Sequence, residues 1–208
     1  MSILDCLAKF RTGIRQTNDY ISIAFQQDSN GVDLFSMDKK EFIVTSAFLK
    51  MFIYWEEFLE NLFINYLVGE PSIDGTQVNT FVSPQSQEHA HKILIGTQKY
   101  VDWANHEIVR RLASIFFENG DPLATNIASI SSELSDLKTI RNAAAHISST
   151  TQNKLDALAS RITSRTVSNI SVSKLVMTLD PNNQSITILQ GYQNILDISA
   201  ENIARNRT

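Results

Sequence analysis

Apolar residues recur every three or four positions along most of the chain, which is the spacing of one face of an α-helix. The strongest such stripe lies in residues 38–68, where Phe52, Leu59 and Phe63 widen it. The stripe consists of Val44, Phe48, Met51, Trp55, Phe58, Leu62 and Tyr66. An apolar face of this width predicts a central helix that packs against several neighbours.

Weaker patterns of the same period predict further helices before and after the central one. These helices are expected over residues 2–27, 85–100, 101–118, 131–147 and 150–162. In the third of them, the side chains expected to point inward are Trp103, Ile108, Leu112, Ile115 and Phe116. Arg110 and Arg111 are expected to point at least partly to solvent. At the start of the central helix, Asp38 followed by Glu41 resembles a capping box.

Residues 174–189, KLVMTLDPNNQSITIL, allow two interpretations. They fit a β-hairpin that turns at Asp180–Asn183, or a short helix, a turn and a helix over residues 185–206. A lone hairpin has little stability of its own and the rest of the chain has a helical pattern, so we favour helices within residues 171–206. Residues 69–84 and 118–126 are rich in glycine, proline and polar residues and are expected to be loops.

The composition supports a globular helical protein. The chain has 208 residues, of which 43% are hydrophobic and 19% charged, and this balance excludes a disordered chain. Seven glycines and four prolines are few for a β-fold with many turns. We therefore expect one all-α domain over residues 1–208, built as a helical bundle.

Charge and cysteine content exclude several classes of function. The formal net charge is −4, so any nucleic-acid site must be a local basic patch. The single cysteine, Cys6, excludes an internal disulfide and a zinc site with several cysteines, and we expect it to be a small buried side chain. Charged residues interrupt the most apolar stretch, residues 42–68, and no signal peptide is visible, so we expect a soluble, cytoplasmic protein without a membrane span.

The stretch DLKTIRNAAAHIS, residues 136–148, places an arginine and a histidine on either side of small residues. On a helix, Arg141 and His146 lie about 140° apart, whereas Asn142 and His146 share a face. Three alanines, Ala143–Ala145, leave a nearly bare surface between them. If two copies pack through this surface, two arginines and two histidines meet in one groove.

Such a groove has the groups needed to cleave RNA. Histidine can accept the proton of a ribose 2′-hydroxyl or give one to the leaving 5′-oxygen. Arginine can hold the charge that develops on the phosphate oxygens through paired hydrogen bonds. Attack by the 2′-oxygen of RNA needs no metal ion, so we expect neither a metal nor another cofactor.

The segment IRNAAAH resembles the signature helix of the HEPN superfamily, R-x4-6-H, in which asparagine most often follows the arginine. Residues 51–67, MFIYWEEFLENLFINYL, are similar to the long second helix of prokaryotic HEPN proteins. Residues 133–148, ELSDLKTIRNAAAHIS, resemble the RiboL-PSP-HEPN branch. The resemblance extends over roughly residues 38–165, and the signature helix is its specific part.

The resemblance implies an all-α, HEPN-like bundle with extra helices that forms a two-fold dimer. It implies a metal-independent endoribonuclease that leaves a 2′,3′-cyclic phosphate and a 5′-hydroxyl, in a toxin–antitoxin or anti-phage system with an antitoxin or other partner protein. Arg141 and His146 would be the catalytic pair, Asn142 the polar residue of the motif, and Glu56 a supporting group. Some HEPN toxins have a modifiable tyrosine two places after the histidine, where this chain has Ser148.

Two other interpretations remain open. Some HEPN proteins have lost activity, so the chain could be a silent module that binds RNA, a nucleotide or a protein partner; a helical scaffold with a chance motif is the third possibility. For RNA binding we expect a patch of Arg110, Arg111 and Lys138, extended by Arg161 and Arg165. His89 and His91 point to different sides of a helix, which argues against a zinc site.

Overall fold

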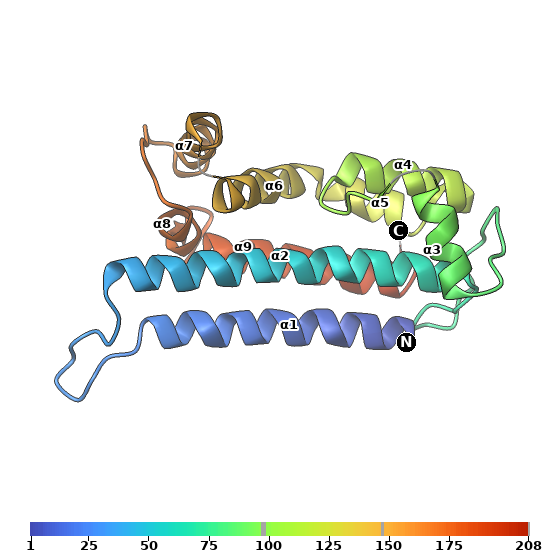
Figure 1. The fold of residues 1–208 in the computed structure, drawn as a ribbon, viewed down its shortest axis with the longest axis horizontal. Helices are drawn as coiled ribbons and strands as arrows, with labels where there is room; N and C mark the ends of the chain where they lie inside the picture. The colour runs from blue at the N-terminus through green and yellow to red at the C-terminus, as the bar shows by residue number, and fades with distance from the viewer. Residues whose placement is uncertain (97–98, 147, 208) are drawn as a thin grey trace. The chain divides into compact units, whose positions relative to one another are not determined.

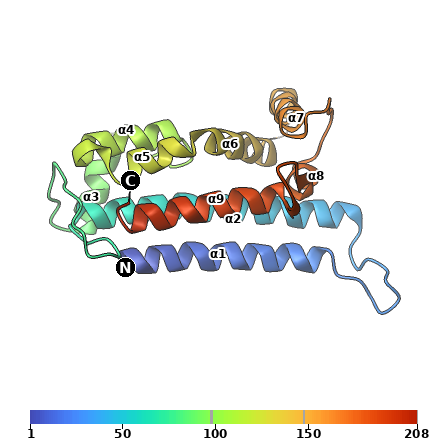
Figure 2. The same cartoon turned by 180° about the vertical axis from the view of Figure 1, so that it is seen from behind.

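A computed structural model describes residues 1–96, 99–146 and 148–207 of the chain. In this part the chain is mostly helical, and its only named strands form a small two-stranded sheet, so the expected all-α character is confirmed. The elements are α1 (Ile3–Ala24), α2 (Met37–Leu67), α3 (Gln87–Ile95), α4 (His106–Phe116), the 3₁₀-helix η1 (Glu118–Gly120), α5 (Leu123–Ser129), α6 (Ser131–Ala145), α7 (Ser149–Thr163), α8 (Val172–Met177), β1 (Leu179–Asp180), β2 (Asn183–Thr187) and α9 (Ile188–Ala204). Figure 1 and Figure 2 show these elements from opposite sides.

The chain divides into two compact units, each assembled from separate segments. Unit 1 comprises Met1–Arg11, Tyr54–Leu134 and Ile195–Thr208, and unit 2 comprises Thr12–Ile53 and Ser135–Asn194. The boundaries fall inside helices, so α1, α2, α6 and α9 each contribute residues to both units. The expectation of one domain over residues 1–208 stays a prediction.

An aromatic cluster forms the core of unit 1. The ring of Phe10 in α1 lies 5.7 Å from that of Trp55 and 5.4 Å from that of Phe58, both in α2. One turn further along α2, the ring of Phe63 lies 4.6 Å from that of Phe117. Trp55 is only 1% exposed, so it belongs to the core as expected.

The predicted apolar stripe of α2 is buried along its whole length. All seven of its residues, together with Phe52, Leu59 and Phe63, are buried. In unit 2, α2 contributes Val44, Phe48, Met51 and Phe52 to a core that also contains Leu137, Ile140, Leu155, Leu158 and Tyr192. The prediction of a broad central helix is therefore confirmed, and its width reflects its contribution to both cores.

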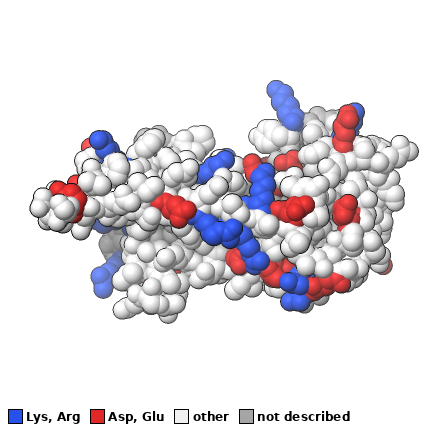
Figure 3. Space-filling view, turned by 90° about the horizontal axis from the view of Figure 1, so that it is seen from below, with Lys and Arg blue, Asp and Glu red and all other residues white. Residues whose placement is uncertain are grey.

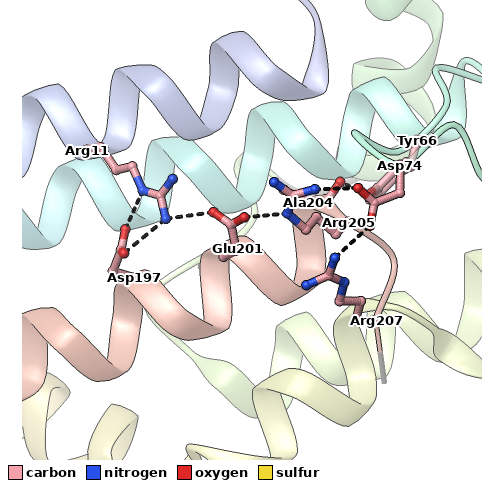
Figure 4. A network of polar contacts seen from close by, with 8 residues as sticks. All are labelled: Arg11, Tyr66, Asp74, Asp197, Glu201, Ala204, Arg205 and Arg207. Carbon is pink, nitrogen blue, oxygen red and sulfur yellow. Dashed lines mark hydrogen bonds and ion pairs between the residues drawn. The ribbon is translucent and has the colours of Figure 1, made fainter.

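In unit 1, the C-terminal end of α9 is enclosed by polar contacts (Figure 4). The Tyr66 hydroxyl donates to the backbone carbonyl of Ile203 at 2.7 Å, and the N–H of Ile73 donates to the carbonyl of Ala204 at 2.9 Å. Helix C-termini have carbonyls without helical partners, and these donors satisfy two of them.

A chain of ion pairs surrounds the same end of α9. Arg11 of α1 contacts Asp197 and Glu201, at 2.7 Å in each case. Arg205 contacts both Glu201 and Asp74, and Arg207 reaches Asp74 at 3.0 Å. Hydrogen bonding by Arg205 and then Arg11 lowers the pKa of Glu201, against some desolvation. The arginines of this helix end are therefore each paired with a carboxylate.

The preference for helices alone over residues 171–206 is wrong, because a β-hairpin lies between α8 and α9. β1 and β2 pair antiparallel, with Leu179 opposite Thr187. The Asp180 carboxylate accepts the backbone N–H of Asn182 at 2.8 Å, which forms the turn.

Packing against α9 explains how so short a hairpin is stable. The N–H of Ile188, the first residue of α9, donates to the carbonyl of Thr178 at 2.9 Å. A Cβ atom at Gly191 would lie 2.8 Å from the Asp180 carboxylate, so glycine lets α9 pass directly beneath the turn. The hairpin therefore depends on a helix that follows it in the sequence.

Details of α4 and α5 also differ from expectation. Ile108 and Ile115 are 36% and 52% exposed, so the prediction that they point inward is wrong. The buried face of α4 consists of Val109, Ala113 and Phe116. α4 begins only at His106, because the Asn105 side chain caps it by accepting the N–H of Glu107. Helix α5 occupies part of the segment 118–126 that was expected to be a loop.

The predicted capping box at Asp38 and Glu41 is wrong. α2 begins at Met37, which places Asp38 inside the first helical turn. The Glu41 carboxylate accepts a hydrogen bond from the Ser171 hydroxyl at 2.7 Å instead of the N-cap backbone. A carboxylate in the first turn still stabilises the helix through its dipole.

Candidate functional site

The candidate site lies in unit 2, at the C-terminal end of α6. The helix ends at Ala145, and the N–H of His146 donates to the carbonyl of Asn142 at 3.0 Å. His146 therefore completes the last helical hydrogen bond, although the residue lies just outside the helix. Its side chain is exposed, so the imidazole is accessible to a ligand.

The guanidinium of Arg141 is turned toward the asparagine of the motif. Arg141 is half-buried, and its Nη1 atom lies 3.5 Å from the Oδ1 atom of Asn142, a long contact. Positions 142 and 146 are one helical turn apart, so Asn142 is expected to lie on the side of the helix that faces His146. The structure thus brings Arg141 together with Asn142, while helix geometry predicts that Arg141 and His146 lie about 140° apart.

The alanines between these polar residues leave a shallow surface. Ala143 and Ala144 are half-buried and Ala145 is exposed, and none has a side chain longer than a methyl group. Another backbone can approach such a surface closely. This is the surface through which two copies were expected to pack.

The start of α7 holds the end of the signature helix. The Ser148 hydroxyl accepts the N–H of Thr151 at 3.2 Å, and the two residues form a capping box. The Thr151 hydroxyl donates to the carbonyl of His146 at 2.6 Å. The backbone of His146 is therefore tied to the first turn of α7. Ile147, the last residue of the predicted signature helix, lies outside the described residues.

Asp136 attaches the signature helix to two other helices of unit 2. Its carboxylate pairs with Arg161 of α7 and accepts a hydrogen bond from the Tyr192 hydroxyl of α9 at 3.0 Å. No local sequence pattern predicts this cluster, because Asp136 and Tyr192 are separated by 56 positions. Arg161, which was expected to extend a phosphate patch, has an acidic partner.

The remaining predicted site residues are distributed over both units. Glu56 is half-buried on α2 in unit 1, and Arg110 and Arg111 are exposed on α4 in the same unit. Lys138 is half-buried on α6 in unit 2. The residues of the expected RNA patch therefore belong to two different units, and RNA binding by them stays a prediction.

The described residues contain no group of three or more histidine, cysteine, aspartate or glutamate side chains that could hold a metal ion. The Nδ1 atom of His89 accepts the N–H of Gln85, and that of His91 lies 3.7 Å from Glu60. Cys6 is buried, as expected, and burial raises the pKa of its thiol to about 11. A thiol with so high a pKa is a weak nucleophile.

Figure 3 shows side chains of both charge signs interspersed on a mostly uncharged surface. This mixture agrees with the small net charge of −4. Among the described helices, none is long and apolar enough to cross a membrane.

Comparisons with known proteins add no relative. No protein-family model, no curated protein and no solved structure matches the chain. The candidate site is therefore defined by Arg141, Asn142 and His146 and by the residues that hold them in place.

Proposed function

We propose that the chain is a HEPN-type, metal-independent endoribonuclease that acts as a toxin or anti-phage effector. The observation that carries the proposal is the end of α6, where an exposed imidazole and a guanidinium lie on either side of a surface of alanines. The backbone of His146 is held by α7 and the helix itself by Asp136. A backbone held in this way supports the proposal, because positioned catalytic groups favour a reaction.

The reaction uses the 2′-oxygen of the RNA itself as nucleophile. One His146 imidazole takes the proton of the 2′-hydroxyl while the oxygen attacks the adjacent phosphorus. The bond to the 5′-oxygen breaks, and the His146 of a second copy gives a proton to the leaving oxygen. Arg141 stabilises the charge on the other phosphate oxygens. The products are a 2′,3′-cyclic phosphate and a 5′-hydroxyl.

The proposed substrate is unpaired RNA. The 2′-oxygen must swing into line with the bond that breaks, and a stacked duplex resists this movement. A two-fold dimer packed through Ala143–Ala145 would supply the second histidine and a groove for the strand.

A cleavage assay with excess chelator tests the activity. Wild type is expected to cut single-stranded RNA, and Arg141→Ala and His146→Ala are expected to be inactive while they remain folded. His91→Ala removes another histidine that faces solvent in part and is the matched control; it should cut like wild type. Cutting by His146→Ala at the wild-type rate would exclude this mechanism and favour a silent binding module.

The dimer is tested at Ala144. Ala144→Trp is expected to weaken dimerisation and cleavage together, because the bulky side chain fills the surface between the two helices. Ala8→Trp, at an exposed position of α1, is the control for adding an indole to the surface. Light scattering after size-exclusion chromatography measures the mass. If Ala144→Trp dimerises as strongly as wild type and is fully active, the two copies do not pack through Ala143–Ala145.

The biological role is tested by expression in cells. Wild type is expected to arrest growth, and Arg141→Ala to relieve the arrest at equal protein level. Normal growth with active wild-type enzyme would argue against the role as a toxin and leave the chemistry standing.

A further inference from the structure

The segment that contains the candidate site is basic although the chain as a whole is acidic. Residues 135–166 contain five lysines and arginines and two aspartates, a formal charge of +3, whereas the whole chain has −4. A local positive region of this kind attracts polyanions, and an acidic remainder limits unspecific binding elsewhere.

One face of α7 carries two exposed cations, Lys154 and Arg161. Four exposed residues spaced by four, three and four positions form a line along the helix, which we term the basic stripe. They are Thr150, Lys154, Ala157 and Arg161. The small side chains of Thr150 and Ala157 leave room beside the two cations for a backbone to approach. The core side of α7 is formed by Leu155, Leu158 and Ala159.

One carboxylate reaches the stripe, Asp136 of α6, which pairs with Arg161, whereas the acidic residue of α7 is directed away from Lys154. Asp156 lies two positions from Lys154, about 200° around the helix. Its carboxylate accepts the backbone N–H groups of Asn169 at 2.9 Å and Ile170 at 3.0 Å. Desolvation raises the pKa of Asp156, but these hydrogen bonds lower it by more, so its pKa lies below the ordinary value. Its charge is directed to the loop after α7.

Both ends of the basic stripe are attached to the signature helix. Near its start, Thr151 donates to the carbonyl of His146, and at its far end Arg161 pairs with Asp136. Figure 1 shows α7 nearly end-on beside the C-terminal end of α6, so the two helices cross steeply. The stripe therefore begins near His146 and runs along α7, across the direction of α6.

We propose that the basic stripe binds the phosphate backbone of single-stranded RNA next to the cleavage site, with Lys154 and Arg161 each contacting a phosphate. The two residues are seven positions apart, which corresponds to about 10 Å along a helix. Asp136 positions the Arg161 guanidinium for this contact. The inference rests on the proposed function, because that function brings RNA to the neighbouring imidazole.

Binding measurements in an inactive background test the stripe without cleavage. The full chain with His146→Ala is titrated onto a fluorescent, unstructured oligouridine at several salt concentrations. Lys154→Gln and Arg161→Gln are each expected to weaken binding about fivefold at 0.1 M salt and to lower the salt slope by about 0.7. Arg15→Gln and Lys39→Gln, which remove exposed cations of unit 2 from α1 and α2, are the controls and should bind unchanged.

Each outcome decides the proposal. An unchanged salt slope in Lys154→Gln, whose side chain is exposed, overturns it even if Arg161→Gln perturbs the fold. Equal losses in the two controls also overturn it, as does equal, Lys154-dependent binding to vesicles of acidic phospholipid or to polyglutamate. If the stripe variants lose RNA binding while wild type cuts no RNA, the proposed nuclease fails and the binding surface stands.

Discussion

The C-terminal ends of α9 and α6 both carry arginines, but in the part of the chain that the structure describes only those at the end of α9 are paired with carboxylates. At the end of α9, Arg205 and Arg207 pair with Asp74 and Glu201, and Tyr66 donates to the last carbonyls. At the end of α6, the guanidinium of Arg141 has one long contact among the described residues, to Asn142.

The difference separates stabilising groups from groups available to a ligand. Ion pairs and buried hydrogen bonds satisfy each other inside unit 1 and hold α9 in place. The side chains of Arg141, Asn142 and His146 form no ion pair among the described residues, so we expect them to contribute little to stability. Under the proposed function, these side chains are the ones available to a charged ligand.

The largest expected effect is on activity. Arg141→Ala is expected to lower the rate of RNA cleavage by about 10²–10³-fold, because the charge on the phosphate oxygens loses its donor. Its free energy of unfolding should stay within about 0.5 kcal/mol of wild type. Single-turnover cleavage and urea denaturation measure the two quantities; a large loss of stability would show that the arginine is structural.

Tyr66→Phe is expected to lower stability and leave cleavage activity unchanged. It is expected to lower the free energy of unfolding by about 1–3 kcal/mol, because buried carbonyls at the end of α9 lose a hydrogen-bond donor. Cleavage by the folded fraction should be unchanged. Chemical denaturation of the variant beside wild type gives the loss, and equal stability of both would mean that the enclosed helix end does not depend on this hydroxyl.

Ser148→Ala is expected to cost about 1 kcal/mol through loss of the N-cap of α7, and to reduce cleavage as well. The second effect arises because the capping box holds the carbonyl of His146. Ser86→Ala removes the N-cap of α3 in unit 1 and is the matched control, with a similar loss of stability and no loss of cleavage by folded protein. If Ser148→Ala and Ser86→Ala cleave RNA equally well, the N-cap of α7 has no part in positioning His146.

The smallest effect concerns pH. The pKa of Glu201 is lowered from its ordinary value of 4.5, so the carboxylate binds its proton more weakly in the folded than in the unfolded chain. Its contribution to stability is complete above pH 4.5 and is lost as the pH falls through the lower, folded pKa. Unfolding free energies of wild type and Glu201→Gln should therefore converge on acidification; a constant difference would exclude the linkage.

Some of the fold follows directly from the sequence. The long stripe of α2 was predictable because a strict period of three and four persists over 23 residues from Val44 to Tyr66. The hairpin was one of two interpretations of its segment and α5 was not expected, since both are short and the hairpin depends on distant packing, as with Gly191 beneath Asp180. Short elements carry too few periodic positions for a pattern to appear.

The candidate site shows the same limit. Arg141, Asn142 and His146 are neighbours in the sequence, so their common position at one helix end could be predicted. Asp136 and its partners come from three separate helices and have no local pattern. The exposure of Ile108 and Ile115 was also unpredictable, because either flank of a short amphipathic helix can face the core.

The segmented construction of the two units constrains how the protein is made on the ribosome. Unit 2 carries the signature helix, yet it needs residues 12–53 from early in the chain and residues up to Asn194 from late in it. A nascent chain that has only passed His146 therefore lacks α9 and the Tyr192 contact to Asp136. Unit 2 can therefore assemble only after Asn194 has been synthesised, and under the proposed function the nascent chain would be unable to cleave RNA before that point.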